Sequence, residues 1–202
     1  MELITDLSAE PIRLELIKTT VKQEGFAFID NGISEALLSR LQAECAEAKR
    51  SAKKAISETP LAYRSSLASL GPVGIGLLES ETPSAILKPI FGKSFKYCAD
   101  SSCYTYYEAG DFLSPHRDGA DNCEVTLLFY ISATEPGSDP QTSGLYLSLF
   151  TEDAFGRPIL SKSIPTPMGG IMVGRGSETV HGRDELAPGE HIWMLTACFT
   201  AI

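Results

Sequence analysis

The sequence predicts an α+β protein in which a helical N-terminal part is followed by a sandwich or jelly roll of short strands. Up to residue 93, apolar residues recur mainly at helical spacing. From Ser94 onward, short apolar runs are separated by Gly, Pro, Asp and Asn, which is typical of many strands joined by turns. Helices first and strands afterwards favour this class over repeated β-α units. The length of 202 residues suits a single domain.

Three helices and one strand are expected in the N-terminal part. The first helix begins near Ser8, which can cap it, and ends at Gly25. The stretch GFAFIDN follows as a short strand. A second helix starts at Ser34 and, from the spacing of its apolar residues, extends to about Ile56. A third helix, TPSAILKPIFG, is closed by Gly92.

The segment of residues 58–80 has neither helical nor strand periodicity and is rich in Ser, Gly and Pro. A plain surface loop would have this composition. The segment also carries Tyr63 and Arg64 among small residues, and loops that bind ligands are often of this kind. We therefore expect a mobile flap over a pocket, with an ordinary loop as the alternative.

Five stretches of the C-terminal part, residues 94–202, have the character of strands. They read FKYCADSSCYTYYEA, CEVTLLFYIS, GLYLSLF, GGIMVG and HIWMLTACFT. Turn-forming residues separate them, so we expect these strands to build the sandwich or jelly roll.

Charge and cysteine content restrict the partners and the compartment. The formal net charge of −9 disfavours nucleic acid, because phosphate binding needs clustered Lys and Arg. The first stretch, MELITDLSAE, lacks the basic and apolar regions of a secretory signal, and no apolar run is long enough for a membrane span. The five cysteines show no C-x-x-C spacing, so we expect free thiols and a cytoplasmic protein without membrane contact.

Two of the three histidines lie where they suit a metal site. In YYEAGDFLSPHRD, His116 and Asp118 are two residues apart at a strand end, so both side chains can point to one face. His181 follows the apolar strand GGIMVG and could lie opposite them. Two His and one carboxylate with open positions are typical of non-haem Fe(II) oxygenases. For each histidine singly, a hydrogen-bonded structural role is the alternative.

The order of motifs from Tyr104 to Phe199 resembles that of the iron(II)/2-oxoglutarate dioxygenases, in their prolyl-hydroxylase-like branch. A Tyr-x-x-Gly turn leads to His-x-Asp in YYEAGDFLSPHRD, an aliphatic strand carries a Tyr in VTLLFYIS, and GGIMVGRGSETVHG places a late His before the last strand. GFAFIDNGISEALLSRL matches the usual N-terminal strand and helix. The resemblance implies a double-stranded β-helix, a form of jelly roll, with the N-terminal helices packed on its outside.

The resemblance also implies the cofactors and the reaction. Fe(II) would be held by His116, Asp118 and His181. The cosubstrate 2-oxoglutarate would chelate the iron through its keto-acid end, and O2 would take the remaining position. Conversion of 2-oxoglutarate to succinate would accompany hydroxylation or a related oxidation of the substrate.

Three further residues are candidates for the cosubstrate pocket. In the enzymes that this chain resembles, a Tyr in the position of Tyr130 reaches the cosubstrate carboxylate, and Thr126 shares its strand parity. Tyr107 begins the Tyr-x-x-Gly turn and would form part of the pocket wall. Structural roles in the core are the alternatives for all three.

One feature of the family is missing from the sequence. Family members bind the far carboxylate of 2-oxoglutarate with an Arg or Lys about one strand beyond the second His, and His191 occupies that position here. An imidazole lacks the bidentate fork of Arg. Either His191 binds the carboxylate, or Arg183 or Arg175 does, or 2-oxoglutarate is not the cosubstrate.

The leading interpretation is therefore an Fe(II)/2-oxoglutarate-dependent oxygenase that acts on a small molecule, an amino acid or a peptide. A mononuclear iron enzyme that does not use 2-oxoglutarate is the second interpretation. The third is a non-catalytic β-helix domain that binds a ligand.

Overall fold

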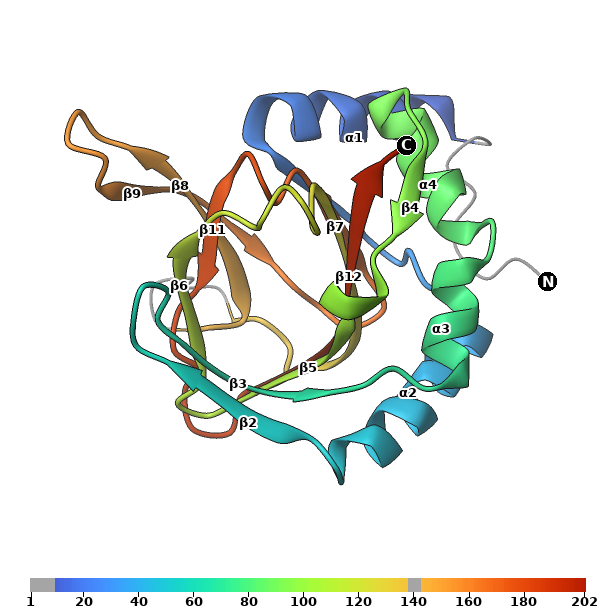
Figure 1. Ribbon diagram of the computed structural model, residues 1–202, viewed down its shortest axis with the longest axis horizontal. Helices are drawn as coiled ribbons and strands as arrows, with labels where there is room; N and C mark the ends of the chain where they lie inside the picture. Colours follow the sequence, from blue (N-terminus) through green and yellow to red (C-terminus); the bar gives the residue numbers. More distant parts are fainter. Residues whose placement is uncertain (1–9, 138–142) are drawn as a thin grey trace.

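A computed structural model describes residues 10–137 and 143–202, in which helices flank a barrel-like β-structure (Figure 1). The helices are α1 (Pro11–Glu24), α2 (Glu35–Lys49), α3 (Pro72–Glu79), α4 (Thr82–Phe91) and the 3-10 turn η2 (Ala99–Ser101). The first strands are β1 (Phe26–Ile29), β2 (Lys53–Ser57), β3 (Tyr63–Ala68), β4 (Phe95–Tyr97), β5 (Cys103–Glu108) and β6 (Phe112–His116). The later strands are β7 (Val125–Ala133), β8 (Tyr146–Glu152), β9 (Pro158–Pro165), β10 (Ile171–Gly174), β11 (Val180–Arg183) and β12 (His191–Ala201).

The strands form one continuous antiparallel sheet in the order β1-β10-β7-β12-β5-β3-β6-β11-β8-β9, with β2 paired to β3 and β4 to β12. Strands β10, β7, β12 and β5 make one wall of the barrel, and β6, β11, β8 and β9 make the other. These two facing walls, with β1 beside β10 and β3 joining β5 to β6, form a double-stranded β-helix. The expected fold class is therefore confirmed.

Alternation along β7 divides the apolar residues into two cores. Leu127 and Phe129 pack with Leu41 of α2 in the layer between the sheet and the helices. Leu128 and Tyr130 point to the other face, into the barrel. The helices therefore cover the outside of the wall that contains β10, β7, β12 and β5, as expected, and leave the barrel interior for a site (Figure 1).

Local signals explain where the helices begin and end. Ser34 caps α2 by accepting a hydrogen bond from the backbone N–H of Leu37 at 3.3 Å. Gly92 ends α4 in the left-handed conformation, with φ of 71°, as the sequence predicts. Gly25 follows α1 with φ of 87°. The predicted cap Ser8 lies outside the described residues.

Two predictions about the N-terminal part are wrong. The helix expected to reach Ile56 ends at Lys49, and the residues after it form β2. The segment 58–80, expected to be irregular, contains β3 and α3. Strand β3 forms although its sequence has no apolar period, because it pairs with β2, β5 and β6. Such tertiary pairing overrides local propensity.

The prediction of free thiols is wrong for two of the five cysteines. Cys123 and Cys198 form a disulfide between the loop before β7 and the end of β12. The pairing of β7 with β12 brings these two residues together, although 75 positions separate them in the sequence. Cys45, Cys98 and Cys103 are free.

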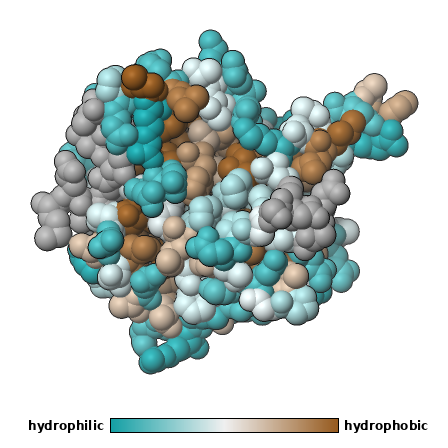
Figure 2. Space-filling view, turned by 180° about the vertical axis from the view of Figure 1, so that it is seen from behind, coloured by the Kyte–Doolittle hydropathy of each residue, from teal (hydrophilic) through white to brown (hydrophobic). Residues whose placement is uncertain are grey.

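The hairpin of β8 and β9 projects from the barrel (Figure 1) and carries exposed apolar side chains, visible as brown atoms on the arm in Figure 2. Phe155, Ile159 and Leu160 lie on this hairpin and are exposed. Among the helices of the described residues, none combines the length and the apolar character that crossing a bilayer requires.

Candidate active site

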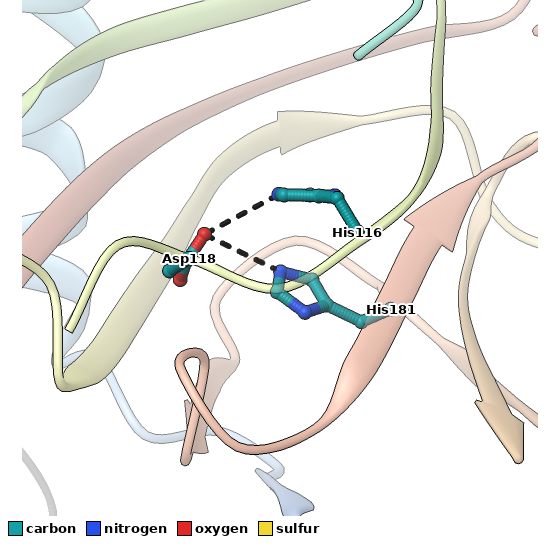
Figure 3. A group of neighbouring side chains, drawn as sticks. All are labelled: His116, Asp118 and His181. Carbon is teal, nitrogen blue, oxygen red and sulfur yellow. Dashed lines mark ion pairs between the residues drawn. The ribbon is translucent and has the colours of Figure 1, made fainter. Parts of the chain in front are cut away.

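His116, Asp118 and His181 converge inside the barrel (Figure 3). Strands β6 and β11 are paired so that His116 and His181 lie directly opposite each other. Asp118 follows two residues after the end of β6. Its Oδ1 lies 3.3 Å from Nε2 of His116 and 3.8 Å from Nε2 of His181, and the three potential ligand atoms all lie within 4.8 Å of one another.

Backbone carbonyls fix the orientation of both imidazole rings. Nδ1 of His116 donates to the carbonyl of Ser114 at 3.1 Å, and Nδ1 of His181 donates to the carbonyl of Thr179 at 2.9 Å. A carbonyl only accepts, so the proton of each neutral ring is on Nδ1. Both Nε2 atoms therefore present a lone pair toward Asp118. Hydrogen bonds of this kind orient histidines in metal sites.

The Asp118 carboxylate has two different oxygens. Oδ2 accepts a hydrogen bond from the hydroxyl of Thr126 at 2.7 Å, and Oδ1 faces the two histidines. The backbone N–H of Asp118 also donates to the carbonyl of Gly176 at 2.9 Å. Thr126 points into the barrel, as its parity indicates. Its hydroxyl, however, is bound to Asp118, so the structure gives it a different partner from the expected cosubstrate.

Burial and charge favour the protonation states that bind cations. Burial lowers the pKa of His181 below its ordinary value and outweighs the attraction of Asp118. Burial raises the pKa of Asp118, but interactions with His116 and His181 in their protonated forms and the hydrogen bond from the Thr126 hydroxyl outweigh burial and lower this pKa. A neutral imidazole and an ionised carboxylate are the ligand forms of these side chains.

A cavity of about 230 Å³ lies beside the three residues, within the barrel. Leu113, Leu128, Leu147 and Met194 give it an apolar wall, and Tyr63 contributes from β3. The segment predicted as a flap therefore does reach the cavity, as part of the sheet. Apolar walls of this kind exclude water and strengthen electrostatic interactions inside.

Among the described residues that line this cavity, Arg183 is the one lysine or arginine. It shares the parity of His181 on β11, and it is only 3% exposed. Its guanidinium donates to the Gly144 carbonyl at 2.6 Å and to the Tyr130 hydroxyl at 3.4 Å, and it lies 5.5 Å from the centre of the Tyr107 ring. Within residues 10–137 and 143–202, it forms no ion pair with a carboxylate.

His191 lies outside this cavity. Its ring contacts the hydroxyls of Ser132 at 2.9 Å and Thr134 at 3.1 Å and packs against Trp193. On β12, the even-numbered residues such as Met194 point into the barrel, so the odd-numbered His191 cannot do so. The structure thus separates His191 from the other predicted site residues. Arg175 also lies outside the residues that line the cavity.

One residue of the site was missed by the sequence analysis. A Cβ on Gly176 would lie 2.0 Å from Oδ2 of Asp118 and 2.5 Å from the Thr126 hydroxyl. Only glycine therefore leaves room for the carboxylate at this position. The sequence signal was the pair Gly174 and Gly176 shortly before His181.

Solved structures of known enzymes have the same fold as this chain. No protein family and no curated protein matches the sequence. Among solved structures, a Pseudomonas putida prolyl-4-hydroxylase matches 93% of this chain and 98% of its own, with 19% identity and a TM-score of 0.61. This chain therefore has the same fold as the Pseudomonas putida enzyme. A Trichoplax adhaerens prolyl hydroxylase, solved with a peptide fragment of hypoxia inducible factor, matches 96% and 91%, with 14% identity and a TM-score of 0.66.

A third similar structure is that of an enzyme with a different activity. The non-heme alpha ketoglutarate dependent epimerase SnoN from nogalamycin biosynthesis matches 94% of this chain and 81% of its own, with 12% identity and a TM-score of 0.75. These identities are low, so the likeness concerns the fold. The same β-helix therefore occurs in enzymes that catalyse different reactions, so the reaction of this chain has to be inferred from its own side chains.

Proposed function

We propose that this chain is an Fe(II)/2-oxoglutarate-dependent oxygenase of the hydroxylase type. The convergence of two imidazole Nε2 atoms and one carboxylate oxygen beside a cavity with a buried arginine carries this proposal. The fold that the chain shares with two prolyl hydroxylases and an alpha ketoglutarate dependent epimerase supports it.

The donor set suits ferrous iron. His116, His181 and Asp118 supply two nitrogens and one oxygen, the ligand set of non-haem Fe(II) oxygenases. Bound iron would supply the open coordination positions at which a keto acid and O2 react. The chain itself fixes both imidazoles through their Nδ1 protons and keeps the carboxylate ionised.

Arg183, Tyr130 and Tyr107 form the proposed site for the far carboxylate of 2-oxoglutarate. A guanidinium can bind a carboxylate through two parallel hydrogen bonds, and the phenols can donate further ones. Burial makes such a pair strong, because a dianionic cosubstrate would neutralise a cation that has little access to water. Of the three candidates from the sequence, His191, Arg183 and Arg175, we therefore assign Arg183 to the binding of the far carboxylate.

The part of the substrate that enters the cavity is proposed to be uncharged. Once Arg183 and the three metal-binding residues are assigned, no charged side chain of the described residues remains in the cavity wall. A charge buried there without a partner would be strongly unfavourable. A neutral small molecule or an uncharged side chain of a peptide fits this wall better than a free amino acid. Turnover of neutral compounds and of their carboxylate analogues would separate these classes.

The test is succinate formation from 2-oxoglutarate by anaerobically purified protein given Fe(II) and O2, with binding of Co(II) measured in parallel. His116→Ala and His181→Ala should lose both succinate formation and Co(II) binding. His191→Ala, a histidine outside the cavity, is the matched control and should keep both. Metal binding without succinate, with any substrate class, would favour an iron enzyme that does not use 2-oxoglutarate. Absence of metal binding in the wild type would favour the non-catalytic domain.

A further inference from the structure

The contacts around Asp118 hold its two carboxylate oxygens in different environments. Thr126, at the start of β7, is only 4% exposed, and its hydroxyl donates to Oδ2 at 2.7 Å. Oδ1 receives no hydrogen bond from Thr126 and lies between the two histidine Nε2 atoms. One oxygen is therefore bound by the protein, and the other is available to a cation.

Gly176 leaves the space that Oδ2 of Asp118 occupies. A Cβ at Gly176 would lie 2.0 Å from Oδ2, so any side chain at this position would displace the carboxylate oxygen or the loop. The backbone hydrogen bond from the Asp118 N–H to the Gly176 carbonyl fixes the same contact from the main chain. The absence of a side chain at Gly176 therefore lets Oδ2 lie where it accepts the hydrogen bond from Thr126.

The start of β7 is itself fixed near Thr126. Thr126 lies opposite Cys198 on β12, and the disulfide of Cys198 with Cys123 closes the loop before the strand. The sulfur of Cys123 lies 3.4 Å from the Thr126 hydroxyl. The threonine is thus a rigid donor, because both its own strand and the preceding loop are tied to β12.

We propose that Thr126 is a positioning residue that makes Asp118 a ligand through one oxygen only. The proposal rests on the proposed metal site. Two histidines and one carboxylate oxygen leave three positions of an octahedral ion, enough for a chelating keto acid and O2. A carboxylate that turned to bind through both oxygens would remove one of these positions. Thr126 holds Oδ2 away and so preserves the free position.

The test uses Co(II) alone as the probe, in place of iron, with affinity from calorimetry and coordination from the visible spectrum. Thr126→Val removes the hydroxyl with little change of shape and should weaken Co(II) binding by about ten- to a hundredfold, the usual effect of losing such a supporting contact. It should also change the cobalt spectrum. Thr126→Ser keeps a hydroxyl and should restore both wild-type affinity and wild-type spectrum.

The control is Thr105→Val. Thr105 is a buried threonine of β5 that lines the same cavity, and its hydroxyl bonds that of Thr196 at 2.9 Å, so Thr105→Val loses a comparable hydrogen bond that does not involve Asp118. It should bind Co(II) like the wild type. Equal affinity and spectra for the wild type and a folded Thr126→Val, or failure of Thr126→Ser to restore them, would overturn the positioning role.

These outcomes separate the inference from the proposed function. If the wild type forms succinate while Thr126→Val keeps the wild-type cobalt affinity and spectrum, only the positioning role fails. If Thr126→Val loses affinity and Thr126→Ser regains it, the positioning role stands on metal binding alone. It would then stand even for a wild type that forms no succinate.

Discussion

Replacing Arg183 tests the proposed cosubstrate site most directly. The side chain is 3% exposed and contacts the Tyr130 hydroxyl, and a carboxylate bound there would accept hydrogen bonds from a charged donor. One such hydrogen bond contributes about 1.5–3 kcal/mol, which is about a ten- to a hundredfold change in affinity. We expect Arg183→Met to raise the KM for 2-oxoglutarate by at least this factor, with Co(II) affinity unchanged.

The same substitution has a cost for stability that must be measured separately. Arg183 also donates to the Gly144 carbonyl at 2.6 Å, and the carbonyl would lose this partner. An unsatisfied buried acceptor destabilises a protein by about 1–3 kcal/mol. Urea unfolding therefore accompanies the kinetics. Arg183→Lys provides a milder variant, since it keeps the charge without the fork and should raise the KM less.

The assay is succinate formation at varied 2-oxoglutarate, with His191→Ala and Arg175→Ala as controls. Both residues lie outside the cavity, so both variants should keep the wild-type KM. A folded Arg183→Met with an unchanged KM would refute the assignment. So would a raised KM in His191→Ala, because the reasoning from strand parity would then be wrong.

Two further predictions concern the scaffold. Thiol titration of the denatured protein should find three free cysteines before reduction and five after it, and Cys123→Ser should lower the free energy of unfolding by about 2–4 kcal/mol, because the Cys123–Cys198 bond closes a long loop. Five reactive thiols in the unreduced protein would contradict the disulfide. For Glu44, burial raises the pKa, but hydrogen bonds from Tyr104 and the α3 backbone outweigh it and lower the pKa. Its contribution to stability is therefore present above the ordinary value of 4.5 and is lost as the pH falls through the lowered pKa. In Glu44→Gln, stability measured by urea unfolding should decline less on acidification than in the wild type, and an equal decline would show that other groups control the acid limb.

The parts of the fold with strong local periodicity were predictable. The apolar run of β7 gave a strand close to the observed one, and the helical spacing after Ser34 gave the start of α2 but not its end at Lys49. Strands β3 and β9 were missed for two different reasons. Pairing with strands distant in the sequence determines β3, whereas β9 is mostly exposed and lacks a buried face. Neither feature leaves a regular apolar pattern in the sequence.

The candidate site was predictable in its residue types and only partly in its geometry. His116, Asp118 and His181 could be selected because histidines are rare and the spacing suits one strand end. The choice between His191 and Arg183 depended on strand parity. Counting back from the closing strand ignored parity, and the structure places Arg183, two residues after His181 on β11, in the cavity lining and His191 outside it.

The position of β3 has a consequence for how the chain can be divided and how it folds. Strand β3 lies between β5 and β6, and Tyr63 pairs with Leu113 far along the chain. A fragment that began after residue 93 would have unpaired edges on both β5 and β6 and a cavity open along that side. During synthesis, β3 is made before β5 and β6 and cannot pair with them until they follow. Closure of the barrel therefore depends on contacts of long sequence separation, which form slowly. The hydrogen bonds of β3 with β5 and β6 should accordingly gain protection from hydrogen exchange late in refolding.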